Sequence, residues 1–371
     1  MENKTIYLKL TIYSLFFSFI SCGSIKSRVV HIENVLDQDR TLETVELSRK
    51  KIGIDNISNL GVKDLKTGEL LVSQVIDLDK DGVDDILLFQ TELKARSTQK
   101  YKIIKTSNKE KVETLDYCYS RPVPEREDDY AWENNKVAFR VYGPKGQELV
   151  ESNAGSGILS SGVDIWLKRV EYPIINKWYK KTIDRTGSYH QDTGEGLDNF
   201  SVGVSRGVGG TAVKKNNKYF FSKNYSNYKE ITIGPIRTSF ILEYDSWDAD
   251  GQLITETKKV SLDYGSNLTR YEVTIKGVDE INTGVAIHSK NNKISFDEEL
   301  GWLSNWEFHG DSMLGTGIVA VPNTFKNVDV QDSSINAELN NAYMGLKVNN
   351  TSTEYYAGFG WKKSKQFDNE E

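Results

Sequence analysis

The sequence predicts an all-β protein, on three observations. Short runs of alternating apolar and polar residues recur along the chain, and a period of two residues is typical of half-buried strands. Beyond the N-terminal segment, no stretch has an apolar period of about 3.6 residues of comparable strength. The chain contains 29 Gly and only 6 Pro. Its turns therefore depend mainly on Gly and Asn, as in antiparallel strands joined by tight hairpins.

Composition and charge narrow the class of protein. The 371 residues suffice for one large or two medium domains. They include 19 Tyr, 14 Phe and 7 Trp, which is ample material for a core and excludes a disordered chain. The 47 Lys and Arg residues against 53 Asp and Glu give a net charge of −6, so we expect no nucleic-acid partner. Any anionic ligand would need a local group of cationic side chains.

Residues 1–21 have the pattern of a signal peptide. Lys4 and Lys9 precede an apolar stretch, residues 10–20, that is too short to span a bilayer comfortably. A small residue stands immediately before Cys22, which resembles the lipobox in which the cysteine is acylated and becomes the new N-terminus. An ordinary cleaved secretory signal is the alternative. No acidic residue follows Cys22 directly, so we expect a lipid anchor in the cell outer membrane that faces the periplasm.

The remaining chain divides into two predicted regions. Residues 22–120 contain short apolar or alternating runs and predict a smaller β-sandwich; the runs are at residues 29–32, 86–89 and 101–104. Residues 121–129 are polar, hold two of the six prolines and have no period, so we interpret them as a linker. Residues 121–371 form the larger predicted domain.

The strands of the larger domain are clearest in one continuous stretch. Residues 236–244 alternate, and a turn rich in Asp and Gly leads into a second long run at residues 253–262. Residues 263–267 turn the chain again into residues 269–275. Three long strands with such turns predict an antiparallel meander.

An acidic loop predicts a cation site in the smaller domain. Asp77, Asp79 and Asp81 alternate before Gly82, a spacing that suits an oxygen-seeking cation such as Ca²⁺. Leu88 stands where an EF-hand has its final Glu, so we expect a structural Ca²⁺, with an acidic hairpin turn as the alternative. No cofactor is expected to be required for activity.

Side chains that could take part in catalysis are most concentrated in residues 189–200. This segment combines a phenol, an imidazole and carboxylates on a run punctuated by glycines, with candidates Tyr189, His190, Asp192, Glu195 and Asp198. Arg206 follows beside three glycines, which would let the backbone approach a ligand closely. His190 suits a base near neutral pH, and a purely structural histidine is the alternative.

A second cluster mixes aromatic and charged side chains. Residues 127–134 lead into Arg140, and such a mixture suits sugar recognition, with a solvated domain edge as the alternative. Lys168 lies on a predicted strand and is a further candidate for binding the substrate. For Trp302, Trp306 and His309 we favour core packing over a wall of the sugar site, and we favour a strand end for His288.

Several familiar motifs are missing from the sequence. The chain has no Walker loop, no strand-linked GxGxxG, no CxxC pair, no HExxH and no GxSxG. The sequence therefore contains none of these usual motifs for nucleotide binding, zinc proteases or serine hydrolases.

Four motifs carry a resemblance to a known family: residues 127–134, 162–166, 189–198 and 234–238. They resemble lipoproteins from bacterial polysaccharide-utilisation loci that are known as a domain of unknown function. The resemblance covers most of the chain after the signal segment. It implies a galactose-mutarotase-like antiparallel β-supersandwich, which many polysaccharide lyases also use. Within the family, the sequence looks most like the oligosaccharide dehydratases of ulvan degradation.

That resemblance implies a carbon–oxygen lyase, specifically a hydro-lyase. It would remove water from the non-reducing terminal uronic acid (GlcA or IdoA) of ulvan oligosaccharides, where the uronic acid is linked to sulfated rhamnose. The product would carry a 4,5-unsaturated uronyl end. The C5 proton is acidic only because it lies α to a carboxylate, so the enzyme must neutralise that carboxylate before a base removes the proton.

The chemistry of this reaction assigns roles by residue type. Arg206 and Arg140, with Arg237 behind them, are the expected partners of the substrate carboxylate. His190 leads as the base and Tyr189 follows, and Tyr189 or Glu195 would protonate the leaving hydroxyl. Trp132 would stack on the sugar ring, and Asp192 and Lys168 would bind substrate.

Three other functions remain open from the residues alone. A glycoside hydrolase would need two carboxylates, which Asp192, Glu195 and Asp198 offer. A mutarotase or other sugar epimerase would use a histidine with a carboxylate. A non-catalytic glycan-binding lipoprotein would need only the aromatic and arginine side chains.

Overall fold

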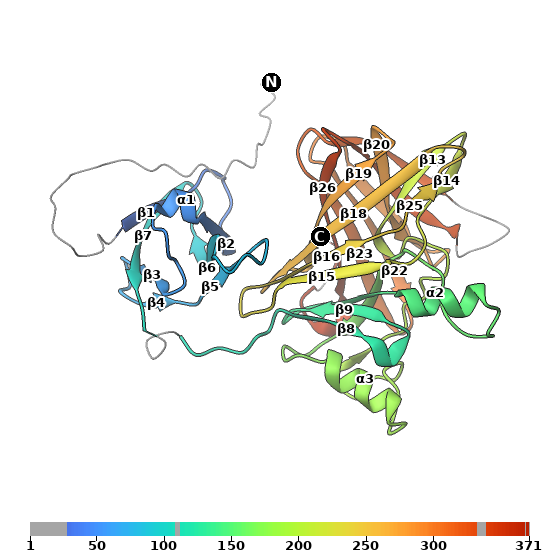
Figure 1. The fold of residues 1–371 in the computed structure, drawn as a ribbon, viewed down its shortest axis with the longest axis horizontal. Coiled ribbons are helices and arrows are strands. Elements are labelled where there is room, and N and C mark those ends of the chain that lie inside the picture. The colour runs from blue at the N-terminus through green and yellow to red at the C-terminus, as the bar shows by residue number, and fades with distance from the viewer. Residues whose placement is uncertain (1–27, 108–111, 332–338, 368, 371) are drawn as a thin grey trace. The chain divides into compact units, whose positions relative to one another are not determined.

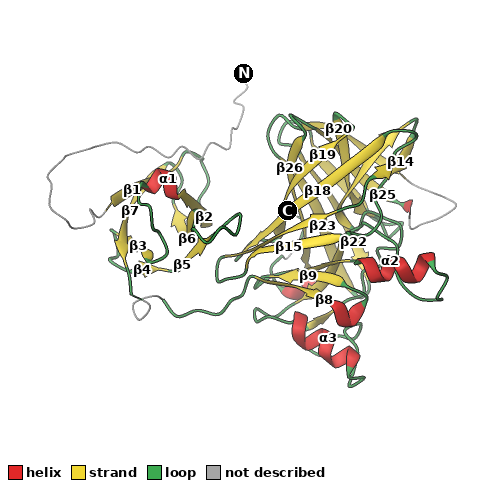
Figure 2. Ribbon diagram, viewed as in Figure 1, coloured by secondary structure: helices red, strands yellow, loops and turns green. Residues whose placement is uncertain are grey.

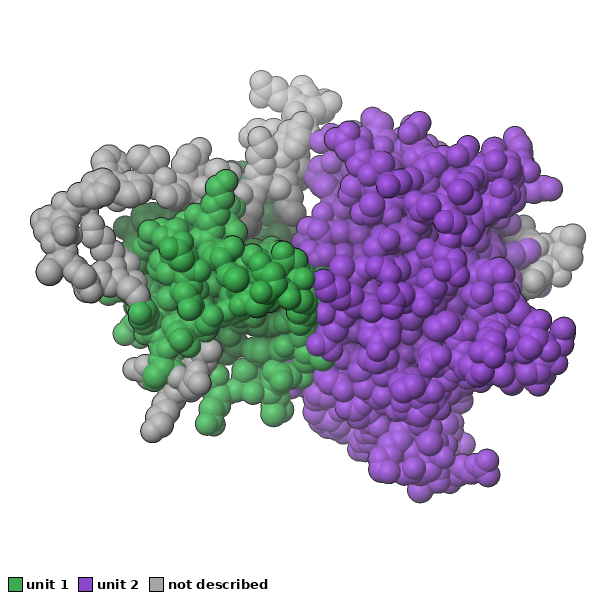
Figure 3. Space-filling model, viewed as in Figure 1, with its two compact units in different colours: residues 1–116, 231–237 green, residues 117–230, 238–371 purple. Residues whose placement is uncertain are grey.

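The structure is a computed structural model that describes residues 28–107, 112–331, 339–367 and 369–370. The predicted signal peptide and the lipidation site Cys22 lie outside the described residues. The chain divides into two compact units, shown separately in Figure 3. Unit 1 comprises Met1–Asp116 and Ile231–Arg237, and unit 2 comprises Tyr117–Glu230 and Thr238–Glu371.

Strands dominate both units, as Figure 2 shows, so the predicted all-β class is confirmed. The helices are few and short, and within the described ranges none is long and apolar enough to cross a membrane. Every pair of named strands with a defined register is antiparallel, as the turns rich in Gly and Asn predicted.

Unit 1 consists of two small sheets around one apolar core. One sheet has the order β1-β7-β3-β4, from β1 (Arg28–Asn34), β7 (Ser97–Lys105), β3 (Leu60–Asp64) and β4 (Leu70–Leu71). The other has the order β2-β6-β5, from β2 (Arg40–Ser48), β6 (Ile86–Leu93) and β5 (Ser73–Ile76), and the short helix α1 (Arg49–Ile52) follows β2. Val62 and Tyr101 from the first sheet share a core with Val45 and Phe89 from the second.

Unit 2 is built on a nine-stranded sheet. Its order is β15-β16-β18-β19-β26-β23-β22-β21, and β17 pairs with β18. The strands are β15 (Asn227–Thr232), β16 (Arg237–Glu243), β17 (Trp247–Asp248), β18 (Leu253–Asp263), β19 (Leu268–Lys276), β21 (Lys293–Asp297), β22 (Trp302–His309), β23 (Ser312–Ala320) and β26 (Ser352–Trp361), with a 3-10 turn, η3 (Lys362–Ser364), after the last. The predicted meander at residues 236–275 corresponds to β16, β18 and β19.

Two five-stranded sheets complete unit 2 (Figure 1). The first has the order β14-β13-β20-β25-β24, from β14 (Lys218–Phe220), β13 (Val208–Lys215), β20 (Glu280–Ala286), β25 (Asn341–Lys347) and β24 (Phe325–Gln331). The second has the order β12-β11-β10-β9-β8, from β12 (Gly196–Leu197), β11 (Asp164–Lys168), β10 (Ala138–Val141), β9 (Asp129–Glu133) and β8 (Tyr119–Val123). Helix α2 (Pro144–Glu151) follows β10.

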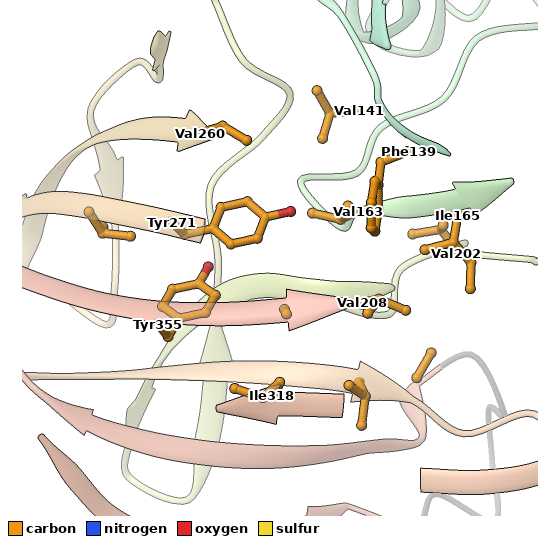
Figure 4. Close-up of a cluster of buried hydrophobic side chains, with 14 of the residues drawn as sticks. Phe139, Val141, Val163, Ile165, Val202, Val208, Val260, Tyr271, Ile318 and Tyr355 are labelled. Carbon is orange, nitrogen blue, oxygen red and sulfur yellow. The ribbon is translucent and has the colours of Figure 1, made fainter. Parts of the chain in front are cut away.

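The main core of unit 2 is lined by alternating residues of all three sheets. Tyr271 and Tyr355 stack on neighbouring strands with ring centroids 5.0 Å apart. Figure 4 shows these rings among aliphatic side chains from the other sheets, including Val163 and Val208. Burying an aliphatic or aromatic side chain of this kind stabilises the fold by about 1.5–3 kcal/mol. The aromatic surplus of the sequence is used largely here.

The β8–β12 sheet has apolar side chains on both faces. Alternate residues of β9 and β10, such as Trp132 and Phe139, point into the main core. The intervening residues, such as Ala131 and Ala138, belong to a second apolar cluster with helix α3 (Ile175–Ile183). One face of this sheet therefore packs in the main core and the other is covered by α3, which lies beside β8 and β9 in Figure 1.

One prediction about local structure is wrong. Residues 121–129 are not a linker: they form most of β8, a 3-10 turn, η1 (Pro124–Arg126), and the start of β9. Pro122 is tolerated because β8 is the edge strand of its sheet, where a missing N–H leaves no partner unpaired. Helix α3 does have a helical apolar stripe, in which Ile175, Trp178 and Tyr179 are buried. These residues span little more than one turn, which is too short to stand out in the sequence.

Candidate functional site

Three of the four histidines of the chain bond to one short segment that follows β12. Each imidazole is hydrogen-bonded to a main-chain carbonyl of that segment: His190 Nδ1 to Asp198 at 2.7 Å, His309 Nε2 to Asn199 at 3.1 Å, and His288 Nε2 to Ser201 at 2.6 Å. A carbonyl oxygen only accepts, so each of these ring nitrogens must donate. Residues 198–201 therefore fix both the orientation and the tautomer of three imidazoles that come from distant parts of the chain.

His190 has the geometry of a general base. Its Nδ1–H is held by the Asp198 carbonyl, and the Asp198 carboxylate lies 3.7 Å from the same nitrogen. The side chain is 59% exposed. In the neutral ring Nε2 is consequently the acceptor, and the nearby carboxylate stabilises the imidazolium that forms when Nε2 takes up a proton.

Arg140 lies at the centre of a buried ionic cluster beside His190. Its guanidinium group binds Asp164 through Nε at 2.9 Å, and it lies 3.1 Å from Asp198 and 3.6 Å from Asp129. Strand alternation explains the grouping: Asp129, Arg140 and Asp164 all project from the α3-covered face of the β8–β12 sheet, and Arg140 is directly opposite Asp164. The single guanidinium is thus enclosed by three carboxylates.

The three carboxyl groups titrate closer to neutral pH than ordinary aspartates. Burial raises the pKa of Asp164 to about 7, and the neighbouring charge of Asp198 adds to this. Burial also raises the pKa of Asp129 and of Asp198 to about 6, although Arg140 opposes it in both. One guanidinium does not compensate for three desolvated carboxylates.

Tyr189 connects this cluster to a second arginine. Its hydroxyl lies 3.4 Å from Nη1 of Arg140 and 3.4 Å from Nε of Arg126. Its ring is buried against Trp166, with centroids 5.1 Å apart, and meets the His190 ring edge-on at 4.5 Å. The phenol and the imidazole are therefore adjacent, and two guanidinium groups lie close to the oxygen that would carry negative charge after proton donation.

The other two imidazoles share a carboxylate. His288 Nδ1 lies 3.2 Å from Oε1 of Glu307, whose second oxygen accepts the main-chain N–H groups of His288 and Ser289. Although burial opposes it, the Glu307 hydrogen bond raises the pKa of His288. Burial lowers the pKa of His309, and the charge of His288 adds to this. The Phe200 ring packs against both imidazoles, with centroid distances of 4.5 and 5.7 Å.

The structure gives Arg206 and Arg237 partners other than His190. Arg206 is completely buried, donates to Ser161 at 3.0 Å and covers the ring of Phe221 at 3.8 Å. Burial lowers its pKa to about 10. Arg237 belongs to unit 1, where it pairs with Glu46. Arg140 is at the site, but its guanidinium is already enclosed by three aspartates.

Trp132 and Lys168 also have structural partners. Trp132 is fully buried, is stacked on Phe139 at 5.3 Å, and donates its indole N–H to Thr269. Its neighbours in sequence, Asp129 and Glu133, point to the opposite face because side chains alternate along a strand. Lys168 is on the same sheet face as Arg140, but it is completely buried and binds Glu133 at 2.8 Å. Neither Trp132 nor Lys168 has a surface for a sugar.

Asp192 and Glu195 hold the loop in its conformation. Asp192 accepts the N–H groups of Gly194 and Gly196 and pairs with Arg169, and these bonds lower its pKa despite burial. Glu195 accepts from Lys177, Trp178 and Tyr172; these bonds likewise lower its pKa against burial. Both carboxylates are therefore engaged within the protein.

The acidic loop of unit 1 converges on a slightly different set of residues from the predicted one. Carboxylate oxygens of Asp77, Asp79 and Asp85 lie within 4.8 Å of one another. Asp81 instead accepts the main-chain N–H of Val83. A structural Ca²⁺ in this loop stays a prediction.

Sequence reasoning missed five members of the site and assigned two of them elsewhere. Asp164, Arg126 and Glu307 were not singled out as site residues, whereas His288 and His309 were assigned to a strand end and to core packing. The only signal in the sequence was the scarcity of histidine, with four in 371 residues; that three of them meet at residues 198–201 is visible only in the folded chain.

Comparisons with known proteins leave the activity open. A family model described as "Domain of unknown function (DUF4861)" matches residues 32–371. "Uncharacterized protein P7" of Formosa agariphila is 46% identical over 355 residues, which are 94% of this chain and 90% of that protein.

Among solved structures, an α-mannosidase from Enterococcus faecalis has a TM-score of 0.50 at 11% identity, over 91% of this chain. A glycosyl hydrolase family 38 protein from the same organism has a TM-score of 0.50 at 10% identity, also over 91%. The chain spans only 43% and 45% of those two structures. These two similarities concern the fold.

Proposed function

The chain belongs to the DUF4861 family. From the resemblance of its sequence to the oligosaccharide dehydratases of ulvan degradation, together with its site geometry, we propose that it is a carbohydrate-active hydro-lyase. Its substrate would be the non-reducing terminal uronic acid of ulvan oligosaccharides, and its product a 4,5-unsaturated uronyl end. The observation that carries the proposal is the pairing of His190, with a fixed Nδ1–H and an exposed side chain, with the adjacent hydroxyl of Tyr189 between two arginines.

The reaction uses these two side chains as base and acid. His190 Nε2 removes the C5 proton while the C4–O bond breaks and the C4=C5 double bond forms. Tyr189 donates a proton to the departing hydroxyl, which leaves as water. The proton on His190 then returns through solvent to the phenolate of Tyr189, so the net change is the loss of one water molecule.

The substrate carboxylate needs a cation that is not already saturated. Arg126 fits this role better than Arg140. It pairs with one carboxylate, Glu127 at 2.9 Å, rather than with three, its side chain is 33% exposed, and its Nε lies 3.4 Å from the Tyr189 hydroxyl. An arginine beside the carboxylate lowers the cost of the carbanion-like charge that develops at C5. We therefore propose Arg126 in the role that the sequence assigned to Arg206.

Glycoside hydrolysis, the main alternative, has weaker geometric support at this site. It needs two carboxyl groups about 5–10 Å apart that reach the glycosidic oxygen. Asp198 and Asp164 are buried against Arg140, and Asp192 and Glu195 accept several hydrogen bonds each. The two similar structures are titled as glycosidases, which supports a carbohydrate substrate for this chain.

Substitution of the base tests the proposal. The His190→Ala variant should lose at least about 100-fold of the rate at which ultraviolet absorbance rises as the unsaturated uronate forms. Mass spectrometry of saturated ulvan oligosaccharides should show loss of one water with the wild type and no change with the variant. His31→Ala, an exposed histidine of unit 1, is the matched control. Near-normal turnover by His190→Ala, or shortening of the oligosaccharide by the wild type, would overturn the assignment.

A further inference from the structure

The cluster of His288, Glu307 and His309 has the composition of a metal site. One ligand atom from each residue lies within 4.8 Å of the other two. Glu307 and His309 are alternate residues of β22 and project from the same face, and His288 follows β20 of a different sheet. Three ligands from two sheets thus meet at one point.

The hydrogen bonds around the cluster orient the ligands as a metal site requires. Ser201 and Asn199 accept from Nε2 of His288 and His309, which leaves Nδ1 of each ring as its acceptor. Metal-binding histidines characteristically donate their other ring N–H to a carbonyl or carboxylate, which fixes the tautomer. The Phe200 ring packs against both imidazoles and restricts their rotation.

The closest approach within the cluster requires a positive charge between its members. In that tautomer the lone pair of His288 Nδ1 faces Oε1 of Glu307, 3.2 Å away. Two acceptors at this distance repel each other unless a proton or a metal cation lies between them.

We propose that His288, Glu307 and His309 bind one divalent transition metal ion, of which Zn²⁺ is the best match. Two imidazoles and one carboxylate form a donor set that suits Zn²⁺ and related ions, whereas Ca²⁺ and Mg²⁺ prefer oxygen ligands alone. Three protein ligands leave coordination positions open. If the proposed function holds, an oxygen of the anionic sugar occupies one of them, because segment 198–201 connects this cluster to His190.

Direct metal binding tests the site without any sugar. Protein freed of metal with a chelator should bind one equivalent of Zn²⁺ in a calorimetric titration. His309→Gln and Glu307→Gln should each weaken that binding at least about tenfold. The control is His31→Gln in unit 1, which should retain wild-type affinity. Circular dichroism of the metal-free variants separates loss of a ligand from loss of the fold.

Cobalt provides a second readout. Bound Co²⁺ should give the visible absorption of an imidazole-coordinated ion in the wild type and lose it in His309→Gln. Adding saturated ulvan oligosaccharide should change that spectrum if the sugar enters the coordination shell. Absence of Zn²⁺ binding by the wild type, or unchanged affinity in both site variants, would overturn the site. Zn²⁺ binding without water elimination would leave the site standing and reject the proposed function.

Discussion

At the scale of single residues, the buried charged side chains at this site form two groups. Arg140 is enclosed by Asp129, Asp164 and Asp198, whereas Lys168 has one carboxylate partner, Glu133, on the same sheet face. The first group has an excess of negative charge and the second is balanced. An unbalanced buried cluster is expensive to maintain and is commonly associated with function.

The titration of Asp164 should be visible as a pH-dependent stability. Its folded-state pKa of about 7 lies above the ordinary value of 3.8, so the native state binds the proton more tightly than the unfolded state does. The resulting stabilisation is complete below about pH 4 and is lost as the pH rises through 7. The melting temperature of Asp164→Asn minus that of the wild type should therefore increase by several degrees from pH 4 to pH 8.

Calorimetric scans across this pH range measure that difference. The groups that act on or sense the charge of Asp164 are Arg140, Asp129, Asp198, Tyr142 and His288. The slope of the difference therefore measures the titration of Asp164 together with the response of these neighbours. Asp184→Asn, at a partly exposed position beside Lys180, is the matched control. A difference that does not vary with pH would contradict the assignment.

At the scale of elements, helix α3 supports the site from behind. Trp178 stacks on Trp166 with centroids 5.5 Å apart, and Trp166 in turn stacks on Tyr189. The Trp178 indole also donates to Glu195 in the loop that leads to Asp198. The helix therefore positions both the phenol and the segment that orients the imidazoles.

Truncation of Trp178 should affect stability and activity together. Trp178→Ala removes a nearly fully buried indole and should cost about 3–5 kcal/mol of unfolding free energy. Activity should fall even where the variant is folded, because Tyr189 loses its support. Lys180→Ala on the exposed side of the same helix is the control, and urea unfolding together with turnover at low temperature provides the measurement. Full activity in folded Trp178→Ala would show that α3 does not position the site.

At the scale of the whole molecule, the net charge affects which anionic substrates the protein would bind. A chain with a net charge of −6 would act on the proposed anionic sugar only through locally concentrated cations. Arg126, the histidines and the proposed metal ion would supply that concentration in unit 2. A small oligosaccharide meets less repulsion from the remaining acidic surface than a long polyanion does.

We propose that Cys22 carries the lipid that attaches the protein to the outer membrane on its periplasmic side. Cys22→Ala should abolish incorporation of a labelled fatty acid and shift the protein from the membrane to the soluble fraction, since acyl chains supply the membrane affinity. Cys118→Ala, at a buried cysteine, should change neither result. Persistent labelling of Cys22→Ala would reject the lipobox assignment.

The sequence by itself determined the features that depend on neighbouring residues. Alternation over residues 236–275 predicted three strands correctly, and the concentration of polar groups at residues 189–200 located the segment that the other site residues approach. The same local reasoning wrongly interpreted residues 121–129 as a linker. They are polar because they include most of an edge strand, β8.

Only the tertiary structure decided which side chains meet. Trp132 and Asp129 are three residues apart in sequence, yet their strand directs them to opposite faces, whereas Arg140 and Asp164 are brought together by strand pairing. Glu307 and His309 meet His288 because strands of two different sheets approach each other. Side-chain direction and burial depend on long-range pairing between strands, and therefore on packing that no local pattern encodes.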